Sequence, residues 1–277
     1  MAGTKPESAE KNGKILSREA LIGNVFFFLL SGHGTAGSTL GFVMLLLAVR
    51  KDVQAEMQAH IDSELGDKLA ATWTVTGEFM KLYNGYTGSV LKEAMRLYNA
   101  VEFIPRRCLI DTNVTDMSGN QLTVPRDTLC LLNFTAAFRH PKIWPTGANC
   151  KDSTGRYHPL LDFDPKRWES YSDKITKPSD VGLRTYFPFG LGGRSCLGKS
   201  LGSIMMIGIM ASIFKDYSVE LVVPRAIEEE AAKSGASEEW VKDRTYYWAL
   251  KMLVDEVECN LLIELRKEFP VRLVPRR

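Results

Sequence analysis

Residues 189–198, FGLGGRSCLG, are the most informative segment of the sequence, because they combine glycines, an arginine and a cysteine immediately before a long apolar segment. Cys196 lies where this loop is expected to enter a helix, and the free N–H groups and dipole at a helix N-terminus favour a thiolate. Gly192 permits a tight turn, and Gly198 lets the helix backbone approach a flat object closely. A thiolate placed in this way can be a nucleophile, a redox centre or a metal ligand.

Two further side chains of the loop narrow this choice. Arg194 can place a cation beside an anionic group, and Phe189 offers an apolar face that shields the sulfur from water. A haem with an axial cysteine uses all of these features together. The alternative is a buried cysteine in a turn that happens to contain glycines, and composition predicts such a chance match in about one chain of this length in ten thousand.

The complete pattern FxxGxRxCxG resembles the haem-binding loop of the cytochrome P-450 superfamily, the haem-thiolate monooxygenases. The resemblance implies haem b as the cofactor, with Cys196 as the axial ligand of its iron. It also implies a set of haem-binding residues, which comprises Phe189, Gly192, Arg194, Cys196 and Gly198.

A second motif depends on this resemblance for its meaning. Glu93 and Arg96 are three residues apart on an expected helix and share one face of it. Taken alone, they predict an ordinary surface salt bridge. Beside the cysteine loop they resemble the ExxR motif of the family, whose partner is an arginine from a later proline-rich loop. The segment PKRW at residues 165–168 matches that loop and makes Arg167 the third member of a structural triad.

Residues 21–49 contain no Asp, Glu, Lys or Arg, and this run is long enough to cross a bilayer. A single-pass membrane protein is therefore an alternative, and microsomal protease protection would test it. The run also resembles the central helix of the family, which crosses the distal face of the haem. We rank the membrane span last, since the same run carries a motif of that helix.

That motif is the segment SGHGT at residues 31–35, which falls where the family carries its oxygen-binding groove. The resemblance implies that Thr35 is the catalytic residue that steadies dioxygen. A helical threonine bonded to its own backbone remains the alternative. Gly34 departs from the family pattern, in which an acid often precedes the threonine, because glycine cannot relay a proton.

Periodicity and turn chemistry predict the elements along the chain. We expect helices from about Ser17 through the apolar run and over 51–65, 89–98 and 201–214. We expect strands over 108–114, 121–124, 128–134, 218–223 and 271–274. Residues 140–190 are predicted to form a long loop, and the charged stretch 228–239 a solvated helix face or an insertion.

The resemblance implies a mainly α fold with small β-sheets, the cytochrome P-450 fold, lacking the N-terminal half. Residues 1–16 are expected to form a polar N-terminal segment and residues 17–277 the C-terminal part of the domain. With 35 basic and 33 acidic residues, the charge balance gives no reason to expect a nucleic-acid partner. Five widely spaced cysteines without a CxxC pair argue against a disulfide framework and favour a reducing compartment.

The function implied by the resemblance is monooxygenation of a small organic substrate by dioxygen, with electrons from an NADPH-dependent reductase. The amino-acid sequence of the central helix resembles that of fungal microsomal-type members, which often serve secondary metabolism. We expect the protein to be associated with the endoplasmic reticulum membrane or cytoplasmic, and the usual N-terminal anchor is not in this sequence. A truncated, catalytically inactive relative is the alternative.

Overall fold

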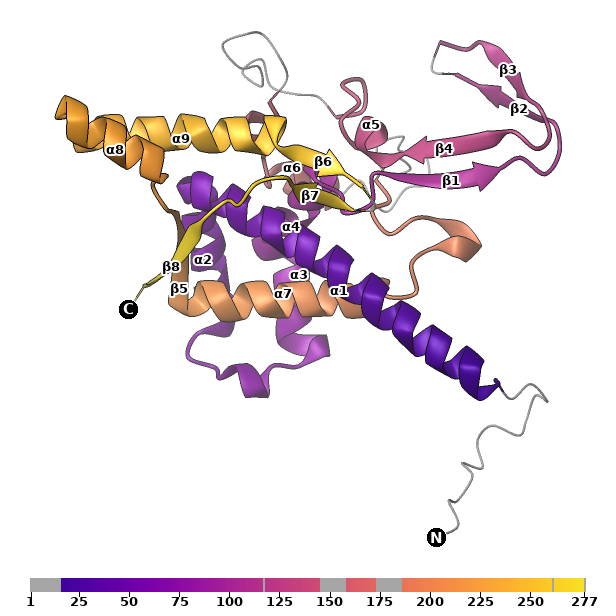
Figure 1. Cartoon of the computed structure of the whole chain (residues 1–277). Coiled ribbons are helices and arrows are strands. Elements are labelled where there is room, and N and C mark those ends of the chain that lie inside the picture. Colours follow the sequence, from indigo (N-terminus) through magenta and orange to yellow (C-terminus); the bar gives the residue numbers. More distant parts are fainter. Residues whose placement is uncertain (1–15, 117, 145–157, 173–185, 261, 277) are drawn as a thin grey trace.

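The structure is a computed structural model and describes residues 16–116, 118–144, 158–172, 186–260 and 262–276. Within these residues the fold is mainly α-helical with small antiparallel sheets, as the sequence predicts (Figure 1). The helices are α1 (Arg18–Val49), α2 (Lys51–Leu65), α3 (Met80–Asn84), α4 (Tyr86–Leu97), α5 (Phe134–Phe138), α6 (Arg167–Ser172), α7 (Lys199–Asp216), α8 (Arg225–Ser234) and α9 (Glu238–Asp255). Short helical turns cover Ala70–Thr72, Val75–Phe79, Pro159–Asp162 and Gly192–Arg194.

The strands form two-stranded antiparallel pairs. They are β1 (Phe103–Arg107) with β4 (Leu129–Asn133), β2 (Thr112–Thr115) with β3 (Gln121–Val124), β5 (Tyr217–Leu221) with β8 (Val271–Pro275), and β6 (Val257–Cys259) with β7 (Ile263–Leu265). Because β5 directly follows α7, its pairing with β8 places the C-terminal strand beside the C-terminus of α7. The elements α8, α9, β6 and β7 lie between β5 and β8 in sequence.

Helix α1 has two halves with different surroundings. Ser17 caps its N-terminus by accepting a hydrogen bond of 3.1 Å from the N–H of Ala20. The N-terminal half extends away from the other helices (Figure 1), and its apolar side chains are exposed, Phe26 to 66%. The C-terminal half is buried from Phe42 to Val49, except for the half-buried Met44. By length and composition alone α1 is apolar enough to cross a membrane, yet 44% of its most apolar window is buried inside the fold.

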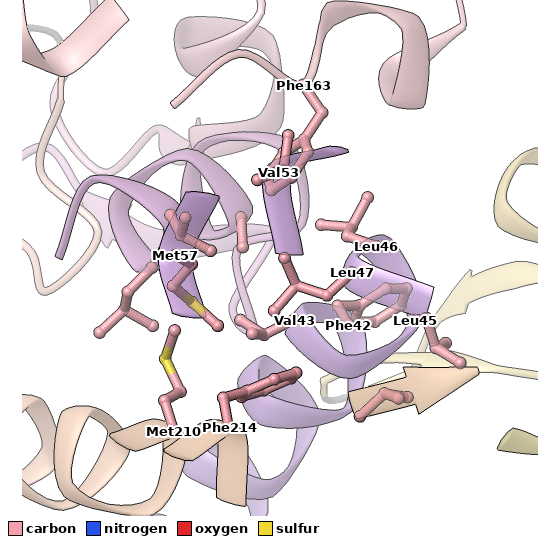
Figure 2. Close-up of a cluster of buried hydrophobic side chains, with 14 of the residues drawn as sticks. Phe42, Val43, Leu45, Leu46, Leu47, Val53, Met57, Phe163, Met210 and Phe214 are labelled. Carbon is pink, nitrogen blue, oxygen red and sulfur yellow. The ribbon is translucent and has the colours of Figure 1, made fainter. Parts of the chain in front are cut away.

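The core lies where α1, α2, α4 and α7 meet. Figure 2 shows Val43 and Leu47 of α1 directed toward Met57 of α2 and toward Met210 and Phe214 of α7. Each of these side chains is fully buried, so each contributes about 1.5–3 kcal/mol of hydrophobic free energy relative to an exposed state. This core fixes α7 against α1, and the cysteine loop leads directly into α7.

One buried polar side chain, Gln54 of α2, joins this helix to α1 and to strand β5. The Gln54 amide nitrogen donates to the carbonyls of Leu47 and Val219, at 2.9 Å in both cases, and its oxygen accepts from the N–H of Val219 at 2.7 Å. All three of these hydrogen bonds join the Gln54 side chain to backbone groups of α1 and β5. Because an unmade buried hydrogen bond is costly, Gln54 fixes β5 beside the helices.

The structure corrects several boundaries predicted from the sequence. Of the strand predicted over 108–114, only residues 112–114 are extended, as part of β2; residues 108–111 link β1, which ends at Arg107, to β2, which begins at Thr112. Strand β1 was not predicted, because its sequence FIPRR contains a proline and two arginines, and Pro105 cannot donate a backbone hydrogen bond. Helix α4 begins at Tyr86, three residues before the predicted start.

The predicted loop over 140–190 contains the helical turn Pro159–Asp162 and helix α6, although residues 145–157 and 173–185 of it lie outside the described residues. The charged stretch is helical, as one of its two interpretations predicted, and forms α8 and the beginning of α9 (Figure 1). The division into residues 1–16 and 17–277 stays a prediction, because residues 1–15 are not described.

Candidate functional site

The cysteine loop is shaped by two glycines in the left-handed region of backbone conformation. Gly190 has φ of 72° and Gly192 has φ of 70°, values that other residue types rarely adopt. The loop is closed by the N–H of Cys196, which donates to the carbonyl of Phe189 at 2.8 Å. Cys196 therefore lies at the end of a folded turn, three residues before α7 begins at Lys199.

The Cys196 thiol is exposed and free, and the neighbouring residues of the loop, polar and apolar alike, are exposed too. Leu197 is 86% exposed, and the neighbouring Leu191 and Leu201 are also exposed. A β-carbon at Gly198 would lie 3.7 Å from the Cys196 sulfur, so glycine leaves one side of the thiol uncrowded. The result is a single accessible soft donor, with exposed leucines near it in sequence, just before a helix N-terminus.

The chemistry of this donor set fits a cofactor that brings most of its own ligands. Among the described residues, no group of three or more His, Cys, Asp or Glu side chains is placed to hold a bare metal ion. A haem needs only one axial thiolate from the protein, since the porphyrin supplies the remaining four nitrogen ligands. The exposed leucines near Cys196 in sequence, Leu191, Leu197 and Leu201, suit a flat, largely apolar group.

The other predicted members of the loop occupy different environments. Phe189 is half-buried and packs against the hydrophobic core, which anchors the start of the loop. Arg194 is exposed, as are the two arginines at the end of β1, Arg106 and Arg107. Arg106 donates to the carbonyl of the adjacent Pro105 at 2.9 Å. These cations lie on the surface, where an anionic group on a ligand can reach them.

The structure brings the three predicted members of the ion-pair triad together. Arg96 donates to both carboxylate oxygens of Glu93, at 2.9 and 2.7 Å. Arg167, from α6, approaches the same carboxylate at 3.4 Å. The side chains of Glu93 and Arg96 are completely buried. A buried charge needs a partner of opposite sign, and this geometry supplies two guanidinium groups for the Glu93 carboxylate.

A fourth charged residue, Asp162, completes the cluster and was not identified from the sequence. Its carboxylate accepts from Arg96 at 2.8 Å and from Arg167 at 2.9 Å. The cluster then contains two carboxylates and two guanidinium groups, and its formal charges balance. Asp162 lies five residues before Arg167, but no local pattern in the sequence marks it as a partner of Arg96, 66 residues away.

Aromatic side chains shield this cluster from water. Trp168 donates its indole N–H to Glu93 at 2.9 Å, and its ring lies 4.5 Å from that of Tyr186. Trp144 packs over the guanidinium of Arg96, with 5.5 Å between the guanidinium carbon and the ring centroid. Burial raises the pKa of Tyr186 well above its ordinary value, so its hydroxyl stays protonated and donates to the carbonyl of Lys92 at 2.9 Å.

Thr35 lies near the point where α1 changes from exposed to buried, and its side chain is half-buried. Its hydroxyl donates to the carbonyl of Ser31 at 2.8 Å, one turn earlier on the helix. This is the backbone-bonded alternative that the sequence left open. His33 is exposed, and Gly34 faces the tip of the β6–β7 hairpin.

Comparison with known proteins points to one family. The model of the family described as Cytochrome P450 matches residues 2–237. "Putative cytochrome P450 CYP13A3" of Caenorhabditis elegans is 32% identical over 212 residues, which cover 76% of this chain and 35% of that protein. "Cytochrome P450 3A13" of Mus musculus is 26% identical over 235 residues, covering 85% and 41%. "Cytochrome P450 monooxygenase 124" of Postia placenta is 27% identical over 244 residues, covering 86% and 40%.

Similarity to solved structures supports the same fold. A crystal structure of a cytochrome P450, CYP102L1, superposes with a TM-score of 0.67 at 20% identity and covers 97% of this chain and 48% of its own. The heme domain of cytochrome P450DA gives the same TM-score at 22% identity and covers 97% and 47%. The chain thus corresponds to about half of these structures, and the aligned regions span 35–41% of the three relatives named above.

Proposed function

Because the chain belongs to the cytochrome P450 family, we propose that it provides the haem-binding half of a haem-thiolate monooxygenase, with Cys196 as the axial ligand of the iron of haem b. The observation that carries this proposal is the exposed Cys196 thiol, with exposed leucines near it in sequence, just before the N-terminus of α7. When bound, the haem supplies the activation of dioxygen that leads to insertion of one oxygen atom into a small organic substrate. The electrons come from an NADPH-dependent reductase.

The residues of the loop hold and orient the cofactor. Gly192 gives the turn that presents Cys196, and Gly198 keeps the approach to the sulfur open. Phe189 packs against the core and so anchors the start of the loop. Arg194 provides a cation for an anionic group at the edge of the cofactor. Bound to the iron, the Cys196 thiolate would donate electron density to it, which is the property that thiolate ligation contributes to haem chemistry.

The buried ion-pair cluster has a structural role in this proposal and does not take part in the reaction. Glu93 and Arg96 belong to α4, and Arg167 belongs to α6, so their contacts fix the proline-rich segment against the helices. The family's structural triad provides the precedent for this role. Its contribution to function is to keep the framework around the cysteine loop in one conformation.

Thr35 is proposed to steady dioxygen or water in the groove of α1. Its hydroxyl proton is directed to the carbonyl of Ser31 and becomes available to a ligand when that bond is released. Gly34 carries no group that can move a proton, so a proton must reach the groove through water or another side chain.

A truncated, inactive relative is the second candidate, and one observation favours an inactive chain. The N-terminal half of α1 exposes a row of large apolar side chains. Under either candidate we propose association with the endoplasmic reticulum membrane or a cytoplasmic location. A substrate from secondary metabolism is part of the first candidate.

The absorption spectrum of the haem-reconstituted, reduced, carbon monoxide-treated protein tests these candidates. We expect a Soret band at the thiolate position for the chain and for the control variant Cys108→Ala. The variant Cys196→Ala is expected to lose that band. Absence of haem uptake, or a band typical of a lost thiolate in the unmodified chain, would support the inactive candidate.

A further inference from the structure

Strand pairing brings together two cysteines that are far apart in sequence. In the antiparallel pair of β1 and β4, Arg106 lies opposite Cys130. The pairing continues one residue past the end of β1, where the N–H of Cys108 donates to the carbonyl of Thr128 at 3.0 Å. Because side chains alternate between the two faces of a strand, Arg106 and Cys108 share one face, and residues directly opposite share it too. Cys108 and Cys130 are therefore diagonal neighbours on one face of this ribbon.

The Cys130 side chain lies close to Cys108. Its Sγ donates to the carbonyl of Thr128 over 3.9 Å, and the same carbonyl accepts the backbone N–H of Cys108. Burial raises the pKa of the Cys130 thiol, and the neighbouring Cys108 thiol raises this pKa further, so the two thiols interact directly. Both thiols are free and half-buried. The ribbon thus presents two reduced thiols side by side.

We propose that Cys108 and Cys130 are a redox-active pair, which a small disulfide such as oxidised glutathione converts into an intramolecular disulfide bond. The thiolate of one cysteine attacks oxidised glutathione, forms a mixed disulfide and releases the first glutathione. The thiolate of the second cysteine then attacks the protein sulfur of the mixed disulfide, and the second glutathione leaves. In total the pair loses two electrons and two protons, and one glutathione disulfide is reduced to two thiols.

This reaction is reversible, so the state of the pair follows the redox poise of its surroundings. In the reducing compartment that the cysteine pattern predicts, the thiols stay free, and oxidising conditions close the bond. The bond joins β1 to β4 and encloses β2 and β3 in a covalent loop. Since Arg106 lies opposite Cys130, the bond also fixes the position of Arg106 on the ribbon. None of these steps depends on haem binding.

Peptide mapping of the full chain without haem tests the pair. The protein is incubated with oxidised glutathione, its remaining thiols are alkylated with iodoacetamide, and it is digested with trypsin. Because trypsin cleaves after Arg107, Arg126 and Arg139, the two cysteines lie in different peptides. We expect these two peptides to be linked through Cys108 and Cys130, and dithiothreitol to separate them.

Two single variants distinguish a pair that reacts together from two independent thiols. In Cys108→Ala and in Cys130→Ala no second thiol can release glutathione, so the remaining cysteine of the pair is expected to retain one glutathione. Cys259→Ala is the matched control, because Cys259 is another half-buried cysteine of a strand pair. This control is expected to leave the crosslink unchanged.

Glutathione retained on Cys108 or Cys130 of the unmodified chain, without a linked pair of peptides, would overturn the proposal. So would a crosslink from either cysteine to Cys196 or Cys259 in comparable yield, or the absence of any product at these two thiols. Mapping of the unmodified chain decides these points even if a variant does not fold.

Thermal unfolding tests whether the folded ribbon accommodates the bond. A disulfide restricts the unfolded chain, so the crosslinked protein is expected to have a Tm roughly 5 °C above that of the reduced protein. Cys130→Ala, treated in the same way, is expected to show no such rise. A crosslinked protein with a lower Tm than the reduced protein would show that the bond distorts the ribbon, and would refute the proposal.

Discussion

Arg96 holds Glu93 through both of its carboxylate oxygens, at 2.9 and 2.7 Å, and neither side chain has any exposed surface. Asp162 and Arg167 complete a cluster with balanced charges, so removing one charge leaves an uncompensated one. We expect Glu93→Gln to lower the free energy of unfolding by about 3–5 kcal/mol, the usual cost of breaking a buried ion pair. Urea unfolding followed by circular dichroism measures this loss.

The control for this prediction is Glu229→Gln on α8. Glu229 accepts a hydrogen bond of 2.8 Å from Arg225, but both side chains are largely exposed. Exposed pairs four residues apart on a helix contribute about 0.3–0.5 kcal/mol. A loss for Glu93→Gln as small as that for Glu229→Gln would contradict the structural importance of the cluster.

A second prediction concerns Asp127, which has φ of 66° in the turn between β3 and β4. Its N–H donates to the carbonyl of Cys108 at 2.8 Å, which holds the residue in this left-handed conformation. Because glycine adopts that conformation without steric cost, Asp127→Gly is expected to raise the free energy of unfolding by about 0.5 kcal/mol. Thermal unfolding at fixed pH measures the change.

Gly119 provides the opposite control in the turn between β2 and β3. Its φ is 88°, and nothing lies near its missing β-carbon, so conformation alone decides the outcome. Gly119→Ala is expected to lower the free energy of unfolding by about 1 kcal/mol. A destabilising Asp127→Gly would show that the side chain of Asp127 contributes more than its backbone conformation costs.

Much of the helical framework could be predicted from the sequence. The apolar periodicity of 51–65 gave α2 at its observed bounds, and the spacing of Glu93 and Arg96 placed both residues on one face of α4. The cysteine loop was predictable because its glycines and the following apolar run are local features. Gly190 and Gly192 of this loop have positive φ, and α7 begins directly after the loop.

The remaining features depend on contacts between distant parts of the chain. Asp162 joins the ion-pair cluster only because the helical turn before α6 packs onto α4, 66 residues away from Arg96 in sequence. Likewise, the contact between Gly34 and Leu262 joins the two ends of the chain. Strand β1 exists because β4 pairs with it, and its own composition favours a turn. Local propensity carries no information about such partners.

A third prediction concerns pH dependence through His60 of α2. Its Nδ1 lies 2.9 Å from the Thr87 hydroxyl, and a β-carbon at Gly85 would lie 2.1 Å from its Nε2. Burial lowers the pKa of His60 below its ordinary value of 6.5, against the opposing effect of Glu64. As the pH falls through 6.5, the unfolded chain takes up a proton before the folded chain does, so stability is lost on acidification.

We therefore expect the Tm to fall between pH 7.5 and pH 5.5, and His60→Gln to make this fall smaller. His33→Gln serves as the control, because the His33 side chain is exposed on α1. An unchanged pH dependence in His60→Gln would mean that other groups account for the effect. The comparison uses the difference in Tm between the two pH values, so a constant loss of stability in the variant does not affect it.

The last prediction concerns Arg276, which attaches the end of the chain to the core. Its guanidinium donates to the carbonyls of Phe214 and Lys215, at 2.8 and 2.9 Å, and forms an ion pair of 2.7 Å with Asp62. Since these bonds close the C-terminal end of α7 and involve a charged donor, Arg276→Ala is expected to lower the free energy of unfolding by about 2 kcal/mol. Arg272 on β8 is the matched control: its bond to Glu220 is 2.9 Å long, but its side chain is 65% exposed. Arg272→Ala is expected to cost less than about 1 kcal/mol, and equal losses for the two variants in urea unfolding would refute a specific role for Arg276.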